Sequence, residues 1–328
     1  MNFKFLHLVI SVFLVFPVSS EEIFFNNHNI HGEDSTFKDF IKWQLSGNKP
    51  DRFSIEMSDE FNLLLKKPKT PYAVWVGHSN FLINNNDINI LTDPIFSKRA
   101  SPISFAGPKR LIPPGINFNL LPDIDVVTVS HAHYDHMDIP TLKRLYEINE
   151  NTLFLVPMNS AKLLLSAGIK NVVEMNWWDT ISLSDTLITF VPVHHWSSRT
   201  PFDKNETLWG GWWFEHSSLK LVHLGDTGYT YDFLTINKEL GSPDFAFIPI
   251  GAYEPRSIMK DSHLNPDEAI QTALDLNATH AIGMHWGTFM LTDEPVQEPP
   301  VLVKNRLKEL DLEGLFTIPI PGKIISLE

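Results

Sequence analysis

Short apolar runs alternate with polar turns from Tyr72 to the end of the chain. The runs are rich in β-branched and aromatic residues and are bounded by Gly, Pro, Asn or Asp, which is typical of β-strands. This pattern predicts strands over Ala73–Ile83, Ile88–Thr92, Asp125–Ser130, Thr152–Val156, Thr186–Pro192, Trp209–His216, Leu219–Leu224, Phe245–Ile250, Ala281–His285 and Gly322–Leu327.

Helical patterns fall between several of these runs. They predict helices over Asp138–Ile148, Ser160–Ala167, Pro266–Asn277 and Pro300–Leu310. Asn265 is the expected N-cap of the third helix, because Pro266 follows at the first helical position and acidic residues fill the first turn. Strands and helices are mixed throughout, so we expect one α/β domain over residues 71–328.

The first 70 residues have a different texture. Residues 1–20 carry Lys4 and then the apolar run Phe5–Val18, which is shorter than the roughly 20 residues that span a bilayer. They predict a signal peptide cleaved after Ser20 and a protein exported to the periplasm or secreted; an uncleaved anchor is the alternative. Residues 21–70 are polar, and we expect an N-terminal extension with one helix around Ser54–Lys67.

Composition narrows the classes of function. The 328 residues are 43% hydrophobic and 20% charged, which is typical of a globular protein with a real core. The absence of cysteine excludes disulfide scaffolds, iron–sulfur clusters and cysteine nucleophiles, so any metal must be bound by nitrogen and oxygen. The formal net charge of -13 argues against nucleic acid as a partner. No feature of the sequence indicates an oligomeric state.

One motif concentrates metal-binding side chains. His131, His133, Asp135 and His136 directly follow the apolar strand Asp125–Ser130. Residues two apart at a strand end project the same way, and the chain must turn before the next helix, so these side chains converge. Imidazoles with a carboxylate and no thiolate suit Zn²⁺, with Mn²⁺ or Fe²⁺ as alternatives. A set of exposed histidines beside a helix start is the bland alternative.

Other candidate ligands also follow strands. They are His194 or His195, Asp226 in the Gly-bracketed run Gly225–Gly228, and His285. Strand ends that open into one cleft are where α/β proteins place their sites. These residues can therefore complete the shells of two metal ions.

The chain resembles the metallo-β-lactamase fold hydrolases, and within them the N-acyl-phosphatidylethanolamine-hydrolysing phospholipase D branch. The resemblance extends from about Thr70 to Pro300. Beside the histidine motif it rests on TDPIFSKRASP (Thr92–Pro102), GPKR (Gly107–Arg110), HHWSSRTPFDKNETLWGGW (His194–Trp212), GDTGY (Gly225–Tyr229), IGAYEPR (Ile250–Arg256) and HWGTF (His285–Phe289). It implies an αββα four-layer sandwich with two mixed β-sheets.

The resemblance also implies two zinc ions per chain. One would be bound by His131, His133 and His195, and the other by Asp135, His136 and His285, with Asp226 bridging them. His195 is preferred to His194 because it directly precedes the Trp196–Arg199 run that resembles the family's.

The chemistry implied is hydrolysis, in which water held between two zinc ions loses a proton and attacks a phosphodiester. We therefore expect a zinc-dependent phosphodiesterase of phospholipase D type that acts on a phospholipid or a small molecule and contacts a membrane peripherally. A lactonase or other ester hydrolase on the same site is the alternative, and a non-catalytic metal-binding protein is a weaker one. A β-lactamase has only the fold in its favour.

Further residues have predicted roles. Asp135, Asp226 and His263 are the candidate catalytic residues, and the candidates for binding substrate are Asp93, Tyr134, Arg199 and Arg256. Asp93 is equally well explained as a turn cap before proline. Lys109, Arg110, Arg199 and Arg256 could meet a phosphate or form structural ion pairs. His78 is left undecided. The tryptophans Trp196, Trp209, Trp212 and Trp213 could line an acyl-chain site, but a role in the core is the commoner explanation.

Overall fold

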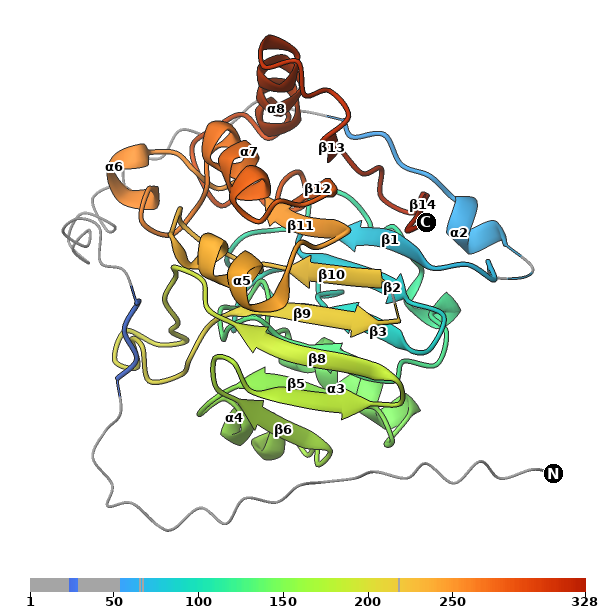
Figure 1. Ribbon diagram of the computed structural model, residues 1–328. Helices are drawn as coiled ribbons and strands as arrows, with labels where there is room; N and C mark the ends of the chain where they lie inside the picture. The colour runs from blue at the N-terminus through green and yellow to red at the C-terminus, as the bar shows by residue number, and fades with distance from the viewer. Residues whose placement is uncertain (1–23, 29–53, 65, 67, 218) are drawn as a thin grey trace.

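The computed structural model describes residues 24–28, 54–64, 66, 68–217 and 219–328. Two seven-stranded sheets face each other, with helices on both outer faces (Figure 1). The predicted αββα sandwich of two mixed sheets is confirmed. The predicted signal peptide lies outside the described residues and stays a prediction.

The first sheet has the strand order β14-β1-β2-β3-β4-β5-β6. Its pairs are antiparallel from β14 to β3 and parallel from β3 to β6. Its strands are β1 (Tyr72–Gly77), β2 (Asn80–Asn84), β3 (Asn89–Thr92), β4 (Val126–Thr128), β5 (Leu153–Pro157), β6 (Val172–Met175) and β14 (Ile324–Ser326).

The second sheet has the order β13-β12-β11-β10-β9-β8-β7. It is parallel from β13 to β10 and antiparallel from β10 to β7, so it repeats the mixed plan of the first sheet. Its strands are β7 (Thr180–Leu183), β8 (Thr186–Val191), β9 (Gly211–His216), β10 (Leu219–His223), β11 (Phe245–Pro249), β12 (His280–Met284) and β13 (Phe316–Thr317).

Alternating side chains build the layers. Ala73 and Trp75 of β1 belong to the apolar cluster shared with the second sheet, while Val74 and Val76 belong to the cluster that also contains Leu142 of α3. This period of two is what a strand buried on both faces requires. The helices are α2 (Glu60–Leu63), α3 (Ile139–Ile148), α4 (Ala161–Ser166), α5 (Asp232–Leu240), α6 (Arg256–Met259), α7 (Pro266–Asp275) and α8 (Glu298–Glu309), with a 3₁₀ turn η1 (Phe118–Leu120).

Two sequence predictions differ from the structure. The run Ala73–Ile83 forms two strands, because His78 adopts φ +60° and the chain reverses there. The helix expected over Ser54–Lys67 is reduced to α2 among the residues described. The backbone N–H groups of Ser58 and Phe61 donate to the carbonyls of Pro321 and Gly322, so the C-terminal segment supplies bonds that a longer helix would have made.

No helix in the described part of the chain is long and apolar enough to cross a membrane.

Candidate metal centre

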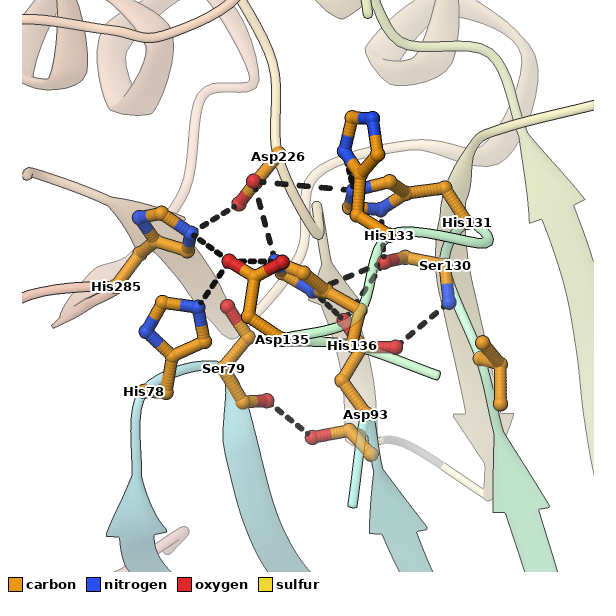
Figure 2. A network of polar contacts seen from close by, with 12 residues as sticks. His78, Ser79, Asp93, Ser130, His131, His133, Asp135, His136, Asp226 and His285 are labelled. Carbon is orange, nitrogen blue, oxygen red and sulfur yellow. Dashed lines mark hydrogen bonds and ion pairs between the residues drawn. The ribbon is translucent and has the colours of Figure 1, made fainter. Parts of the chain in front are cut away.

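The predicted ligands follow strands that end at the same edge of the two sheets. His131–His136 come after β4, His195 after β8, Asp226 after β10 and His285 after β12. β8, β10 and β12 run in the same direction, because β9 is antiparallel to both β8 and β10, and β10, β11 and β12 are mutually parallel. The sequence prediction that these residues converge agrees with the structure, which brings all of them together. Figure 2 shows His131, His133, Asp135, His136, Asp226 and His285.

One group of nitrogen ligands consists of three imidazoles. His131 Nε2 lies 2.8 Å from His133 Nδ1, and His195 Nε2 lies 3.4 Å from the same atom. The ligand atoms all lie within 4.8 Å of one another, which is close enough to share one metal ion. His131 and His195 are buried, so this group closes the inner side of the site.

A second group combines a carboxylate with two imidazoles. Asp135 Oδ2 lies 3.6 Å from His136 Nε2 and 3.7 Å from His285 Nε2. Asp226 lies between the groups: its Oδ1 is 3.0 Å from His285 Nε2, and its Oδ2 is 3.1 Å from His136 Nε2 and 3.9 Å from both His131 Nε2 and His195 Nε2. Figure 2 shows Asp226 between the His285 side and the His131 side.

The charges in this cluster divide the histidines into two kinds. Burial lowers the pKa of His131 and His195 well below the ordinary value and that of His133 to about 4, so these rings are neutral at pH 7. Although burial opposes it, the carboxylates of Asp226 and Asp135 raise the pKa of His136 well above its ordinary value and that of His285 to about 9. In the absence of a metal ion, the protonated rings of His136 and His285 offset the negative charge of Asp135 and Asp226. A bound metal ion would offset that charge in their place.

Unpaired atoms support a metal site. His133 Nε2, His136 Nε2, His285 Nε2 and Asp226 Oδ1 are buried and make no well-aligned hydrogen bond, although His136 and His285 lie within 3.1 Å of the Asp226 carboxylate as ion pairs. Buried polar atoms are normally hydrogen-bonded, so several orphans crowded together need a partner that protein atoms do not supply. Imidazole and carboxylate donors at this spacing fit Zn²⁺ and related ions.

Other residues fix the orientation of the ligands. Asp93 Oδ2 lies 2.7 Å from His136 Nδ1 and accepts a 2.7 Å hydrogen bond from Ser130 Oγ, which in turn lies 2.9 Å from His131 Nδ1. Asp93 is fully buried and lies against the site, where its carboxylate positions ligands; its contact with substrate stays a prediction. His195 Nδ1 lies 3.0 Å from the carbonyl of Ser262, which leaves Nε2 directed at the metal group.

The predicted substrate-binding cations have structural partners. Arg199 donates to the carbonyls of Ala132 and Met137, and its guanidinium lies over the ring of Tyr134, whose hydroxyl donates to the Arg199 carbonyl. Arg199 and Tyr134 therefore stabilise the loop that carries His131, His133, Asp135 and His136.

Arg256 is also held by the protein. It pairs with both carboxylate oxygens of Glu268 and donates to the His263 carbonyl. Arg110 donates to the carbonyls of Ile95 and Ser97. These contacts agree with the alternative that the arginines support the loops around the site, and phosphate binding by Arg199 and Arg256 stays a prediction.

His263 and Asp135 lie on the open side of the centre. Their side chains are 13% and 15% exposed, while those of His136, His285 and Asp226 are 0–2% exposed. His263 Nδ1 lies 4.0 Å from Asp226 Oδ2, and burial lowers the pKa of His263 to about 4. His263 and Asp135 are therefore among the more accessible side chains of the cluster.

Sequence reasoning left the role of one residue beside the site, His78, undecided and missed another, Asn27. His78 Nε2 lies 2.9 Å from Asp135 Oδ2, and its ring packs 3.9 Å from that of His285. Asn27 contacts the backbone of His195 through its side-chain amide. The left-handed turn at His78 and the extended form of the segment around Asn27 have no sequence pattern that marks them as part of a site.

The tryptophans belong mainly to the core. Trp209, Trp212 and Trp213 are buried in the cluster between the sheets. Trp196 is only partly buried and packs 4.3 Å from the ring of His133. Of the four, Trp196 is the one placed to line a substrate site.

Comparisons with known proteins agree with this geometry. Residues 88–286 match the model of the β-lactamase superfamily domain. The chain is 39% identical over 250 residues to N-acyl-phosphatidylethanolamine-hydrolyzing phospholipase D 1 of Caenorhabditis elegans, covering 73% of this chain and 69% of that protein. It is 35% identical over 252 residues to the mitochondrial N-acyl-phosphatidylethanolamine-hydrolyzing phospholipase D of Saccharomyces cerevisiae, covering 75% and 53%. Among solved structures, Igni18, a metallo hydrolase of Ignicoccus hospitalis, superposes with a TM-score of 0.59 at 20% identity over 79% of this chain and 98% of its own.

Proposed function

Because the chain belongs to the β-lactamase superfamily and is a metal-dependent hydrolase, we propose that it is a zinc-dependent phosphodiesterase of phospholipase D type acting on N-acyl-phosphatidylethanolamine-like lipids. The observation that carries this proposal is the position of Asp226 between two ligand groups. The two relatives named for this lipid activity, at 39% and 35% identity, favour the phosphodiester over other substrates.

In this proposal each ligand group binds one zinc ion. His131, His133 and His195 bind the first, Asp135, His136 and His285 bind the second, and Asp226 bridges them. Such a pair, when bound, supplies a nucleophile at neutral pH by lowering the pKa of water and offsets the charge of a phosphate. The protein's own contribution is to hold neutral imidazoles in a fixed orientation, through Asp93, Ser130 and the Ser262 carbonyl.

His263 contacts the substrate phosphate in this proposal. It lies on the open side, and with a pKa of about 4 its ring is neutral at pH 7, so it acts as a hydrogen-bonding group and not as a cation. The bonds from Arg256 to the His263 carbonyl and to Glu268 hold this segment in place.

Two exposed aromatic side chains support a lipid substrate and contact with a membrane. Phe105 is 80% exposed and Phe202 is 90% exposed. Phe105 lies in the loop that follows Ser97, whose hydroxyl donates to Asp138, just after the histidine motif. Phe202 lies in the loop that follows Arg199, whose carbonyl accepts a bond from Tyr134 within that motif. Exposed aromatic residues of this kind are suited to the interface of a bilayer.

A turnover screen tests the proposal. Zinc-loaded protein is offered N-acyl-phosphatidylethanolamine in vesicles, a soluble phosphodiester and lactones. We expect hydrolysis of the lipid, loss of at least a hundredfold of kcat in Asp226→Asn, and wild-type rates in Asp185→Asn, an exposed control outside the site. Phe202→Ser should slow the reaction on vesicles and leave the soluble substrate unaffected. Faster turnover of lactones than of the lipid would overturn the assignment.

A further inference from the structure

Residues 24–28 form an extended strap that lies against the loop carrying His195. In Figure 1 this short blue segment runs beside the yellow loop that follows β8. Phe25 and Asn27 are partly buried, while Phe24, Asn26 and His28 are exposed. The alternation is that of a strand with one face on the protein.

The Asn27 side chain binds the backbone of His195 at two points. Asn27 Nδ2 donates to the His195 carbonyl at 3.0 Å, and the His195 N–H donates to Asn27 Oδ1 at 3.1 Å. Oδ1 also accepts a 3.0 Å bond from Trp209 Nε1, a buried side chain. The amide thus pairs with His195 as a neighbouring strand would, at a position beyond the end of β8.

The rest of the strap anchors this contact. The Phe25 N–H donates to the carbonyl of Asn205, and Phe25 packs on the core between the sheets. His28 lies 3.3 Å from Asp232 and packs edge-on against Trp177. Asn27 is therefore held from both sides by contacts that do not touch the metal centre.

We propose that Asn27 is a positioning residue for the first metal site, so that the strap is an integral part of the hydrolase. The inference rests on the proposed role of His195 as a ligand. His195 is fixed at three points: Ser262 holds Nδ1, and Asn27 holds both backbone groups. Without Asn27 both backbone groups of His195 lose these bonds, and only the neighbouring His194 stays tied to Thr227 and Gly228, so the imidazole can move relative to His131 and His133. Loss of such a supporting group typically weakens metal affinity by roughly 10–100-fold.

Metal titration of purified full-length variants tests the inference. Zinc affinity is measured against a competing chelator for wild type, Asn27→Ala and Asn26→Ala. Asn26 is the matched control, because it is the same residue type, is adjacent in the strap and is exposed. We expect Asn27→Ala to bind one of its two zinc ions at least tenfold more weakly, and Asn26→Ala to match wild type.

A second variant covers the case in which Asn27→Ala does not fold. Asn27→Asp has nearly the same shape but replaces the donor by a carboxylate oxygen that repels the His195 carbonyl, so it should weaken the same zinc ion. Wild-type affinity for both ions in the folded Asn27 variants, or equal losses in the Asn26 and Asn27 variants, would overturn the inference while leaving the proposed function intact. A wild-type protein that binds no zinc would instead overturn the proposed function.

Discussion

His78 has a role that its place in the sequence does not reveal. It is buried in the turn between β1 and β2, where its carbonyl accepts bonds from Trp75 Nε1 and from the N–H of His285. Burial lowers the pKa of His78 to about 3, so at neutral pH the ring is a neutral donor aimed at Asp135 Oδ2. A donor at this oxygen fixes the direction in which the carboxylate faces the second metal.

Replacing His78 should weaken the second metal site. We expect His78→Leu to lower zinc affinity by about 10–100-fold, and His78→Gln to retain more of it because glutamine keeps an N–H donor. Chelator competition measures both. His223→Leu is the control, because His223 is another buried histidine whose Nε2 bonds to the Ser79 carbonyl. It should lose stability but keep its zinc, and an equal loss of zinc in this control would contradict the role of His78.

Sequence analysis identified residues whose pattern lies within a few positions of the chain. It did not identify contacts that depend on residues far away in the chain. His131, His133, Asp135 and His136 lie in one short motif, so a pattern of residue types was enough. The positions of Asp93 and Arg199 depend on partners that are 37 and 67 residues away in the chain, namely Ser130 and Ala132. Sequence analysis therefore found these two residues but could not identify the side chains and carbonyls that they contact within the protein.

Among the elements, the segment after β10 approaches the segment after β4 closely at Gly225. Gly225 has φ +62°, and a Cβ atom at this position would lie 2.5 Å from Ser130 Cβ. Ser130 leads into the ligand motif and Gly225 directly precedes Asp226, so this contact sets the distance between the ligands of the two sheets.

Gly225→Ala should therefore separate the two halves of the site. We expect zinc affinity and kcat to fall at least tenfold, with a loss of stability of about 1–3 kcal/mol from the clash and the strained backbone. Gly168→Ala is the matched control, because Gly168 also has positive φ but a Cβ atom there meets nothing within 4 Å. The control should lose stability alone. Unchanged zinc binding in Gly225→Ala would show that the contact does not set the ligand spacing.

Sequence analysis predicted the elements well wherever the local signal was strong. The cap at Asn265 is confirmed, since its side chain accepts the Glu268 N–H and the Glu268 carboxylate accepts the Asn265 N–H. The edge strands β6 and β7 and the helix α5 were missed. β6 and β7 are only four residues long and partly exposed, so tertiary pairing and not their own pattern makes them strands.

At the scale of the whole molecule, the ligands come from both halves of the sandwich. The motif after β4 belongs to the first sheet, while His195, Asp226 and His285 follow strands of the second. A metal ion bound by residues of both sheets joins the two sheets. Such an ion stabilises the folded state and not the unfolded chain, in which these residues are far apart. At a free zinc concentration of 1,000 times Kd this linkage is worth about 4 kcal/mol.

Metal removal should make stability strongly dependent on pH. In metal-free protein the raised pKa of His285 stabilises the fold fully below about pH 6.5, and this contribution, about 3 kcal/mol at most, is lost as the pH rises through 9. His133 and His263 act in the opposite direction. Their pKa of about 4 means that the unfolded chain takes up protons first, so stability falls as the pH drops below 6.5.

Thermal unfolding from pH 5 to 10, with and without chelator, measures this dependence. We expect the metal-free Tm to be highest near pH 7 and to fall on both sides, and the zinc-loaded protein to keep its Tm on the alkaline side. A metal-free protein whose Tm is flat between pH 7 and 9 would contradict the assigned charge on His285.

The division of the ligands between the two sheets also fixes an order of events during synthesis. His131 is made 154 residues before His285 (285 − 131). A growing chain therefore carries the four-residue motif long before β8, β10 and β12 have been made, and β14, which closes the edge of the first sheet beside β1, comes last. Before β8, β10 and β12 are made, the motif lacks His195, Asp226 and His285, the later members of the cluster. In the proposed function, complete metal loading is therefore a late step that follows the synthesis of β12.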